Sequence, residues 1–91
     1  MRINVQFFAT FRDIFGTKAM EVTVKPGTTI EELLGLVCNT EERRGKIFGN
    51  GKLKPYVIIL KNGRHIQHLD GLETELKEGD KVSLFPPIAG G

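Results

Sequence analysis

The chain has 91 residues, of which 40% are hydrophobic and 26% charged. So short a chain cannot bury two separate cores, and we expect one domain spanning residues 1–91. A single cysteine excludes a disulfide-built scaffold, and no apolar run reaches the roughly 18 residues that a transmembrane helix needs. Thirteen basic and eleven acidic side chains leave a net charge of +2, too small to indicate nucleic acid as a partner.

The amino-terminal residues 1–6 alternate polar and apolar side chains. A signal peptide would need a continuous apolar stretch there, so we expect a cytoplasmic protein with no membrane partner. The alternation runs on through residues 2–9 and predicts a strand with one buried face. Residues 11–15 follow helical spacing for about one turn before Gly16 ends it, and residues 20–24 predict a second strand.

The middle of the chain contains the main predicted helix. Pro26-Gly27 predicts a turn, and Thr28 with Glu31 has the spacing of a capping box at the start of a helix over about residues 29–40. Residues 40–55 are rich in glycine and basic side chains with few apolar ones, which predicts a long surface loop. Within that loop, we expect the charged run 41–44 to face solvent.

Three more strand signals complete the chain. Residues 56–60 are continuously apolar, as in a central strand covered on both faces, and Asn62-Gly63 predicts a tight turn into a weakly patterned partner. Residues 69–76 look irregular, and residues 81–85 predict a last strand. The fold class is therefore α+β, with one main helix packed across one face of a mixed sheet.

Successive side chains of a strand point to opposite faces, and this alternation, or strand parity, predicts an apolar patch on the other face of that sheet. The side chains that we expect to face the helix are Ile3, Val5, Phe7, Val57, Ile59, Val82 and Leu84. The opposite parity then exposes Phe8, Ile58, Leu60 and Phe85. Four large apolar side chains on a small protein indicate a partner-binding surface. Alternatively, the 40–55 loop folds over them, or the twist of the strand hides Phe8.

The carboxyl-terminal segment is the strongest candidate for chemistry. Pro86-Pro87 stiffens the exit from the last strand, Ile88 and Ala89 follow, and Gly90-Gly91 have no Cβ, so that a flexible tail over 86–91 can enter a narrow channel. The Gly91 carboxylate is charged and unreactive as an acyl donor until another enzyme activates it. The protein would then be a carried substrate and not a catalyst. The alternative is an ordinary frayed end.

Other candidate residues carry weaker signals. Cys38 lies on the apolar stripe of the predicted helix and is expected to be a buried structural thiol. His65 and His68 lack companion ligands, so we read both as surface histidines and expect no metal site. Residues 45–52 invite comparison with a phosphate-binding loop, but Leu53 replaces the needed hydroxyl residue. ATP would therefore be used by a partner.

Two blocks of the sequence resemble the MoaD/ThiS family of ubiquitin-like sulfur carriers. Residues 8–16, FATFRDIFG, are similar to the family's Phe-Ala-x-x-Arg-Glu-x-x-Gly opening. Residues 76–91, LKEGDKVSLFPPIAGG, resemble its ending throughout. Residues 26–30 and Asn62-Gly63 extend the similarity to the helix entry and the hairpin. The long 39–55 loop and residues 69–72 instead resemble the archaeal MoaD-like and small-modifier branch.

The resemblance implies a ubiquitin-like β-grasp fold and a reaction cycle with no cofactor bound to the chain itself. A ubiquitin-activating-type (MoeB/ThiF-like) enzyme would use ATP to adenylate Gly91, and sulfur would displace AMP to leave a thiocarboxylate. In the MoaD branch, sulfur passes to a pterin precursor on the MoaE-like large subunit of molybdopterin synthase. In the ThiS branch it passes to the thiazole of thiamin, and other relatives form isopeptide bonds with lysines.

The leading interpretation is a non-catalytic sulfur carrier, in the first place the small subunit of molybdopterin synthase. The alternative is a ubiquitin-like modifier conjugated to lysines of target proteins through Gly91. A third possibility is a passive binding module in which the tail has no role. The sequence leaves the sulfur acceptor and the activating enzyme open.

Overall fold

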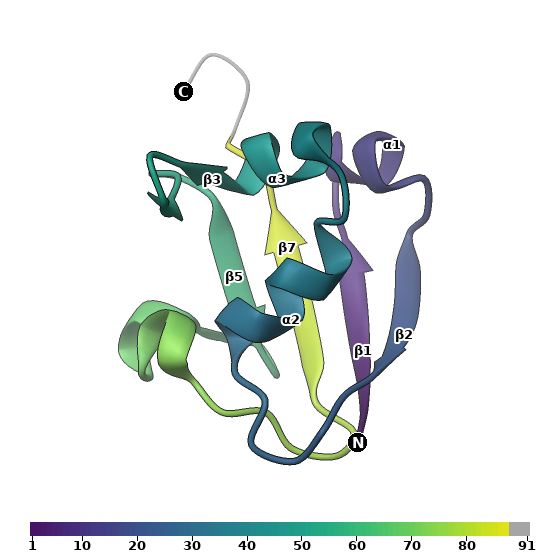
Figure 1. The fold of residues 1–91 in the computed structure, drawn as a ribbon, viewed down its shortest axis with the longest axis vertical. Helices are drawn as coiled ribbons and strands as arrows, with labels where there is room; N and C mark the ends of the chain where they lie inside the picture. The colour runs from purple at the N-terminus through teal and green to yellow at the C-terminus, as the bar shows by residue number, and fades with distance from the viewer. Residues whose placement is uncertain (88–91) are drawn as a thin grey trace.

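The computed structural model describes residues 1–87, which form a five-stranded sheet, a two-stranded hairpin and several short helices (Figure 1). The strands are β1 (Arg2–Phe7), β2 (Ala19–Thr23), β3 (Phe48–Gly49), β4 (Lys52–Leu53), β5 (Ile58–Lys61), β6 (Arg64–His65) and β7 (Lys81–Phe85). The helices are α1 (Phe11–Phe15), α2 (Ile30–Val37) and α3 (Glu41–Ile47), with 3-10 turns η1 (Ile66–His68) and η2 (Gly71–Glu73). No helix within residues 1–87 is long and apolar enough to span a bilayer.

The first and last strands lie side by side in the sheet. The strand order is β2-β1-β7-β5-β6, with β1 and β7 parallel and the other neighbours antiparallel. A parallel pair needs a long crossover, and here the whole middle of the chain serves as that crossover. The α+β class and the mixed sheet with a helix across one face are confirmed (Figure 1).

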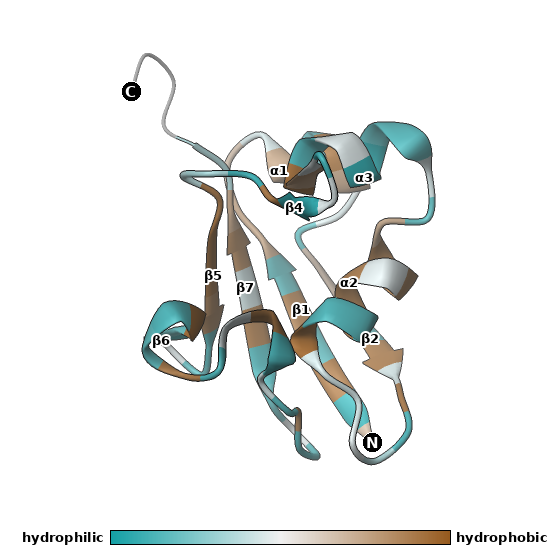
Figure 2. Ribbon diagram, turned by 60° about the vertical axis from the view of Figure 1, so that its left-hand side comes forward, coloured by the Kyte–Doolittle hydropathy of each residue, from teal (hydrophilic) through white to brown (hydrophobic). Residues whose placement is uncertain are grey.

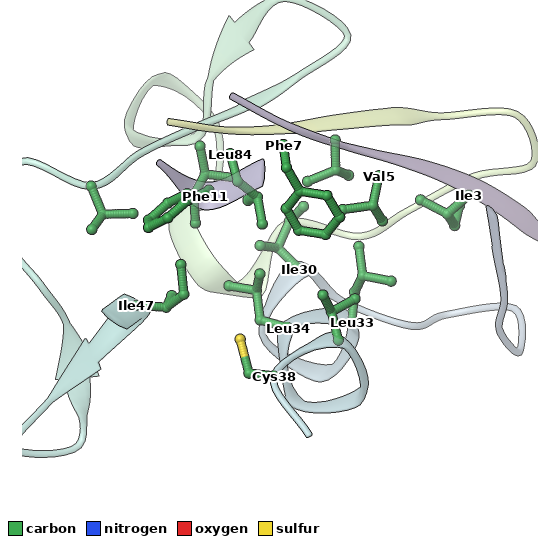
Figure 3. Close-up of a cluster of buried hydrophobic side chains, with 14 of the residues drawn as sticks. Ile3, Val5, Phe7, Phe11, Ile30, Leu33, Leu34, Cys38, Ile47 and Leu84 are labelled. Carbon is green, nitrogen blue, oxygen red and sulfur yellow. The ribbon is translucent and has the colours of Figure 1, made fainter. Parts of the chain in front are cut away.

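The core fills the space between α2 and the sheet. Ile3, Val5 and Phe7 of β1 point toward Leu33 and Leu34 of α2 (Figure 3). All seven side chains that parity assigned to this face are less than 5% exposed. Truncating one such buried side chain to alanine costs about 2–5 kcal/mol, so this layer holds the sheet and α2 in their relative positions.

The capping box at the start of α2 lies one residue later than expected. Thr29, not Thr28, accepts a hydrogen bond from the Glu32 amide (3.3 Å), and the Glu32 carboxylate accepts one from the Thr29 amide (3.1 Å). Both threonines have the required spacing, but Thr29 also forms a bridge with Glu75, which keeps its backbone extended as a helix cap requires. The helix ends at Val37, three residues before the predicted end.

The prediction of a long loop over residues 40–55 is wrong. Thr40 caps α3 by accepting a hydrogen bond from the Arg43 amide (3.1 Å), acidic residues occupy the first turn, and basic residues occupy the last. Asn50 and Gly51, with φ of 53° and 75°, form the turn between β3 and β4. Ile47 and Phe48 are buried and anchor both elements to the core.

The strand predicted from residues 56–60 is present and lies between two other strands, but it is not covered on both faces. The strand β5 begins only at Ile58, after Tyr56, which is 77% exposed with φ of 71°. It lies next to the two-residue strand β6, and its first three residues, Ile58 to Leu60, are apolar (Figure 2). Ile59 is fully buried whereas Ile58 is 40% exposed, so the run is continuous because each face of β5 carries apolar side chains.

Candidate functional site

The outer face of the sheet carries an apolar cluster at the end where β7 stops. This outer apolar cluster consists of Phe8, Ile58, Leu60 and Phe85. Ile58 is the register partner of Phe85, and the Phe8 and Phe85 rings stack with centroids 4.3 Å apart. Only Ile58 is exposed, and the other three side chains are half-buried. The cluster is thus where parity placed it, but less open than expected because the two rings cover each other.

Arg12 extends the outer apolar cluster and was not among the predicted site residues. Its Nε donates a hydrogen bond to the Phe7 carbonyl (3.0 Å), and its guanidinium carbon lies 5.5 Å from the centroid of the Phe8 ring. These contacts hold a positive charge beside the aromatic pair. The sequence feature that could have indicated this contact is the spacing of four residues between Phe8 and Arg12, which brings side chains together across a helical turn.

The carboxyl-terminal segment leaves the sheet directly beside this cluster. Phe85 is the last residue of β7, Pro86 is half-buried, and Pro87 is exposed. Proline has no amide hydrogen and cannot extend the ladder, so the strand ends there. The other predicted site residues, Ile88, Ala89, Gly90 and Gly91, lie outside the described residues. The described part of the site is therefore the root of this segment and the surface around it.

Arg43 is a structural residue that sequence reasoning placed wrongly in solvent. It is half-buried and donates hydrogen bonds to the carbonyl oxygens of Ile14 (3.2 Å) and Phe15 (3.4 Å) and to Asn39 Oδ1 (2.9 Å). Carbonyl groups at the end of a helix lack intrahelical partners, and Arg43 satisfies two of them in α1. It thereby ties α3 to α1 at the end of the molecule where β7 stops.

Cys38 is buried, as the sequence predicted. Burial raises the pKa of its thiol to about 11, although Arg44 and Arg43 act in the opposite direction. The thiol is therefore protonated at neutral pH, and it is the thiolate that acts as a nucleophile. Cys38 serves the core and takes no part in the candidate site.

The two histidines lie at the opposite end of β5 from Ile58. The His65 Nδ1 accepts a hydrogen bond from the Gln67 amide (3.1 Å). The imidazole rings of His65 and His68 are oriented edge to face, with their centroids 6.0 Å apart. His68 is exposed and His65 half-buried. In the part of the chain that the structure describes, no three residues among His, Cys, Asp and Glu are grouped so that they could hold a metal ion.

The fold defines the class of this protein as a ubiquitin-like β-grasp domain, in which a mixed sheet holds one main helix across its face. The family model described as the ThiS family matches residues 5–91, and the chain belongs to this family. The resemblance carried by residues 8–16 and 76–91 is thus confirmed. Members of this family are small ubiquitin-like carrier proteins and not catalytic enzymes.

Relatives named for two different functions match the chain over its length. It is 42% identical to small archaeal modifier protein 3 of Haloferax volcanii, with all of both chains covered. It is 34% identical to the molybdopterin synthase sulfur carrier subunit of Escherichia coli, covering 98% of this chain and 99% of that one. The crystal structure of SAMP1 from Haloferax volcanii superposes with a TM-score of 0.87 at 25% identity, with both chains fully covered.

Proposed function

We propose that this protein carries an activated acyl group on Gly91. The Gly91 carboxylate attacks the α-phosphate of ATP in the site of a ubiquitin-activating-type adenylating enzyme, and pyrophosphate leaves. A sulfur nucleophile then displaces AMP from the acyl-adenylate, which leaves a thiocarboxylate. ATP is consumed by the partner, and the chain supplies only the carboxylate and the surface by which it docks.

The observation that carries this proposal is the position of the outer apolar cluster at the root of the carboxyl-terminal segment, in a chain of the ThiS family. A partner that grips Ile58 and the Phe8 and Phe85 rings also holds the start of the segment that follows Pro86. Gly90 and Gly91 lack Cβ atoms, so that segment can enter a channel too narrow for other residues. Docking and delivery of the carboxylate are thereby coupled.

Two fates of the activated carboxylate are open to this chain. The relative in Escherichia coli supports sulfur transfer as a subunit of molybdopterin synthase, with a large subunit of the MoaE type as its partner. The relative in Haloferax volcanii, matched at higher identity, supports conjugation, in which a lysine Nζ displaces AMP or sulfur and forms an amide. Both fates begin with the same adenylation.

The test combines purified chain, ATP and the adenylating enzyme from the same cells. Pyrophosphate release that depends on Gly91, followed by replacement of one oxygen by one sulfur in the intact mass, is the expected result. Affinity capture from native cells then separates the fates: recovery of a molybdopterin synthase large subunit supports sulfur transfer, whereas a ladder of lysine conjugates supports modification. Pyrophosphate release that persists without Gly91 would contradict the proposal.

A further inference from the structure

The segment that forms α3 and the β3-β4 hairpin concentrates positive charge. Residues 40–56 carry five basic and two acidic side chains, a net charge of +3, whereas the other 74 residues carry eight and nine, a net charge of −1. Within residues 1–87 the ion pairs are Arg2 with Glu78 and Lys61 with Asp80, and both lie outside this segment. The charge of residues 40–56 is therefore not offset by salt bridges of the described chain.

Four of these basic side chains face solvent and one does not. Arg43 is half-buried and donates hydrogen bonds to the carbonyl groups at the end of α1. The exposed basic surface consists of Arg44, Lys46, Lys52 and Lys54. The Arg44 guanidinium carbon lies 5.0 Å from the centroid of the Phe48 ring, which fixes its position on the surface. A guanidinium held in place can pair with a partner's carboxylate at a smaller loss of side-chain entropy.

A hollow beside Arg44 offers room for such a carboxylate. It has a volume of about 270 Å³ and lies between Arg44, Phe48 and the turn at Asn50-Gly51, with Glu41 also on its wall. Glu41 is exposed on the first turn of α3, whereas Arg44 lies one turn further along. An acidic side chain entering the hollow can form the paired hydrogen bonds that arginine makes with carboxylates.

The backbone joins the segment with the basic surface directly to a strand of the outer apolar cluster. The Lys54 amide donates a hydrogen bond to the Ile47 carbonyl (2.8 Å), and the Val57 amide donates one to the Lys54 carbonyl (3.3 Å), which ties the hairpin to the start of β5. The next residue, Ile58, is the register partner of Phe85. The elements α3 and β3 lie at the end of the molecule where β7 stops (Figure 1). The elements that carry both surfaces therefore lie at the end of the molecule from which the carboxyl-terminal segment leaves the sheet.

We infer that the exposed basic surface docks against an acidic patch on the adenylating enzyme. This inference rests on the proposed function, and it names that enzyme because adenylation precedes both fates of the carboxylate. Exposed charges at the rim of an interface mainly raise the rate of encounter and make it depend on salt. A nucleic acid is disfavoured because Glu41 and Glu42 lie on the same short segment and the patch holds only four exposed basic groups.

The experiment compares two charge-reversal variants of the full chain. Lys46→Glu with Lys52→Glu changes the basic surface, and Lys25→Glu with Lys77→Glu makes the same change in net charge at exposed positions away from it. At an ionic strength of about 0.05 M, the first variant should raise KM for pyrophosphate release about tenfold and the second less than about twofold, with kcat unchanged. At about 0.5 M the difference should shrink to about twofold.

The outcomes separate this inference from the function on which it rests. Equal KM values for the two variants, with Gly91-dependent release intact in the wild type, would overturn the docking surface alone. Salt-sensitive binding of an RNA duplex that only Lys46→Glu with Lys52→Glu abolishes, with KM unchanged, would also overturn it. No Gly91-dependent release in the wild type refutes both proposals. If the first variant melts earlier than the second, Lys46→Gln with Lys52→Gln replaces it, with an expected rise in KM of about threefold.

Discussion

The rings of Phe8 and Phe85 stack with their centroids 4.3 Å apart and their planes 12° apart. Phe8 directly follows β1 and Phe85 ends β7, and the parallel pairing of Phe7 with Leu84 brings the two strand ends together. The turn into α1 and the root of the carboxyl-terminal segment are therefore one packed unit. A substitution of either Phe8 or Phe85 should therefore alter the packing at the point where Pro86 leaves the sheet.

The outer apolar cluster is tested most cleanly at Ile58, because it is the one exposed member of the cluster, at 40%. Ile58→Asp should raise KM for pyrophosphate release about tenfold or more, since a buried charge at an interface core is costly. Leu36→Asp is the matched control, because Leu36 is 58% exposed on α2, on the other side of the sheet. Equal kinetics for the two folded variants would remove the cluster from the docking surface.

Arg43 should contribute to stability in a way that its neighbour Arg44 does not. Arg43→Met removes hydrogen bonds to two carbonyl groups of α1 and to Asn39, and we expect a loss of about 1–2 kcal/mol in the free energy of unfolding. Arg44→Met, at an exposed position, should cost less than about 0.5 kcal/mol. Urea denaturation of both variants measures the difference, and equal losses would mean that Arg43 does not cap α1.

Cys38 should make stability fall at alkaline pH. Because burial raises the pKa of the native thiol from 9.0 to about 11, the unfolded chain loses its proton first. The contribution to stability is present in full below pH 9 and is lost as pH rises toward 11, by about 3 kcal/mol in total. Cys38→Ala removes this part of the dependence, so the wild type and the variant should converge or cross over that window. Parallel curves from denaturation at each pH would contradict the raised pKa.

The start of α2 offers a test of the one-residue shift in the capping box. Thr29→Ala should cost about 1 kcal/mol, whereas Thr29→Ser keeps the hydroxyl acceptor and should cost much less. Glu32→Ala should destabilise more than Glu31→Ala, because the Glu32 carboxylate accepts hydrogen bonds from the Thr29 amide and hydroxyl. Thermal denaturation measures all four variants. A larger loss for Glu31→Ala would restore the cap expected at Thr28.

Arg43 and Thr29 show why part of the structure could not be predicted. The helix α3 has one buried residue, Ile47, so its apolar pattern is too weak to register, and its attachment to α1 runs through the side chain of Arg43. Two overlapping capping boxes fit α2 equally well by spacing, and the bridge between Thr29 and Glu75 selects one. Each of these contacts joins residues that are far apart in the chain. Patterns within a short stretch of sequence carry no information about such contacts.

Local periodicity and short motifs were enough to predict the alternation in β1 and β7, the apolar stripe of α2, the buried thiol of Cys38 and the family. The parallel pairing of β1 and β7 at the centre of the sheet depends instead on contacts between distant parts of the chain. Strand periodicity states which side chains share a face, but the choice of neighbouring strand depends on how the whole chain closes around α2. That choice stacks Phe8 on Phe85 and places the basic surface beside the exit of the carboxyl-terminal segment.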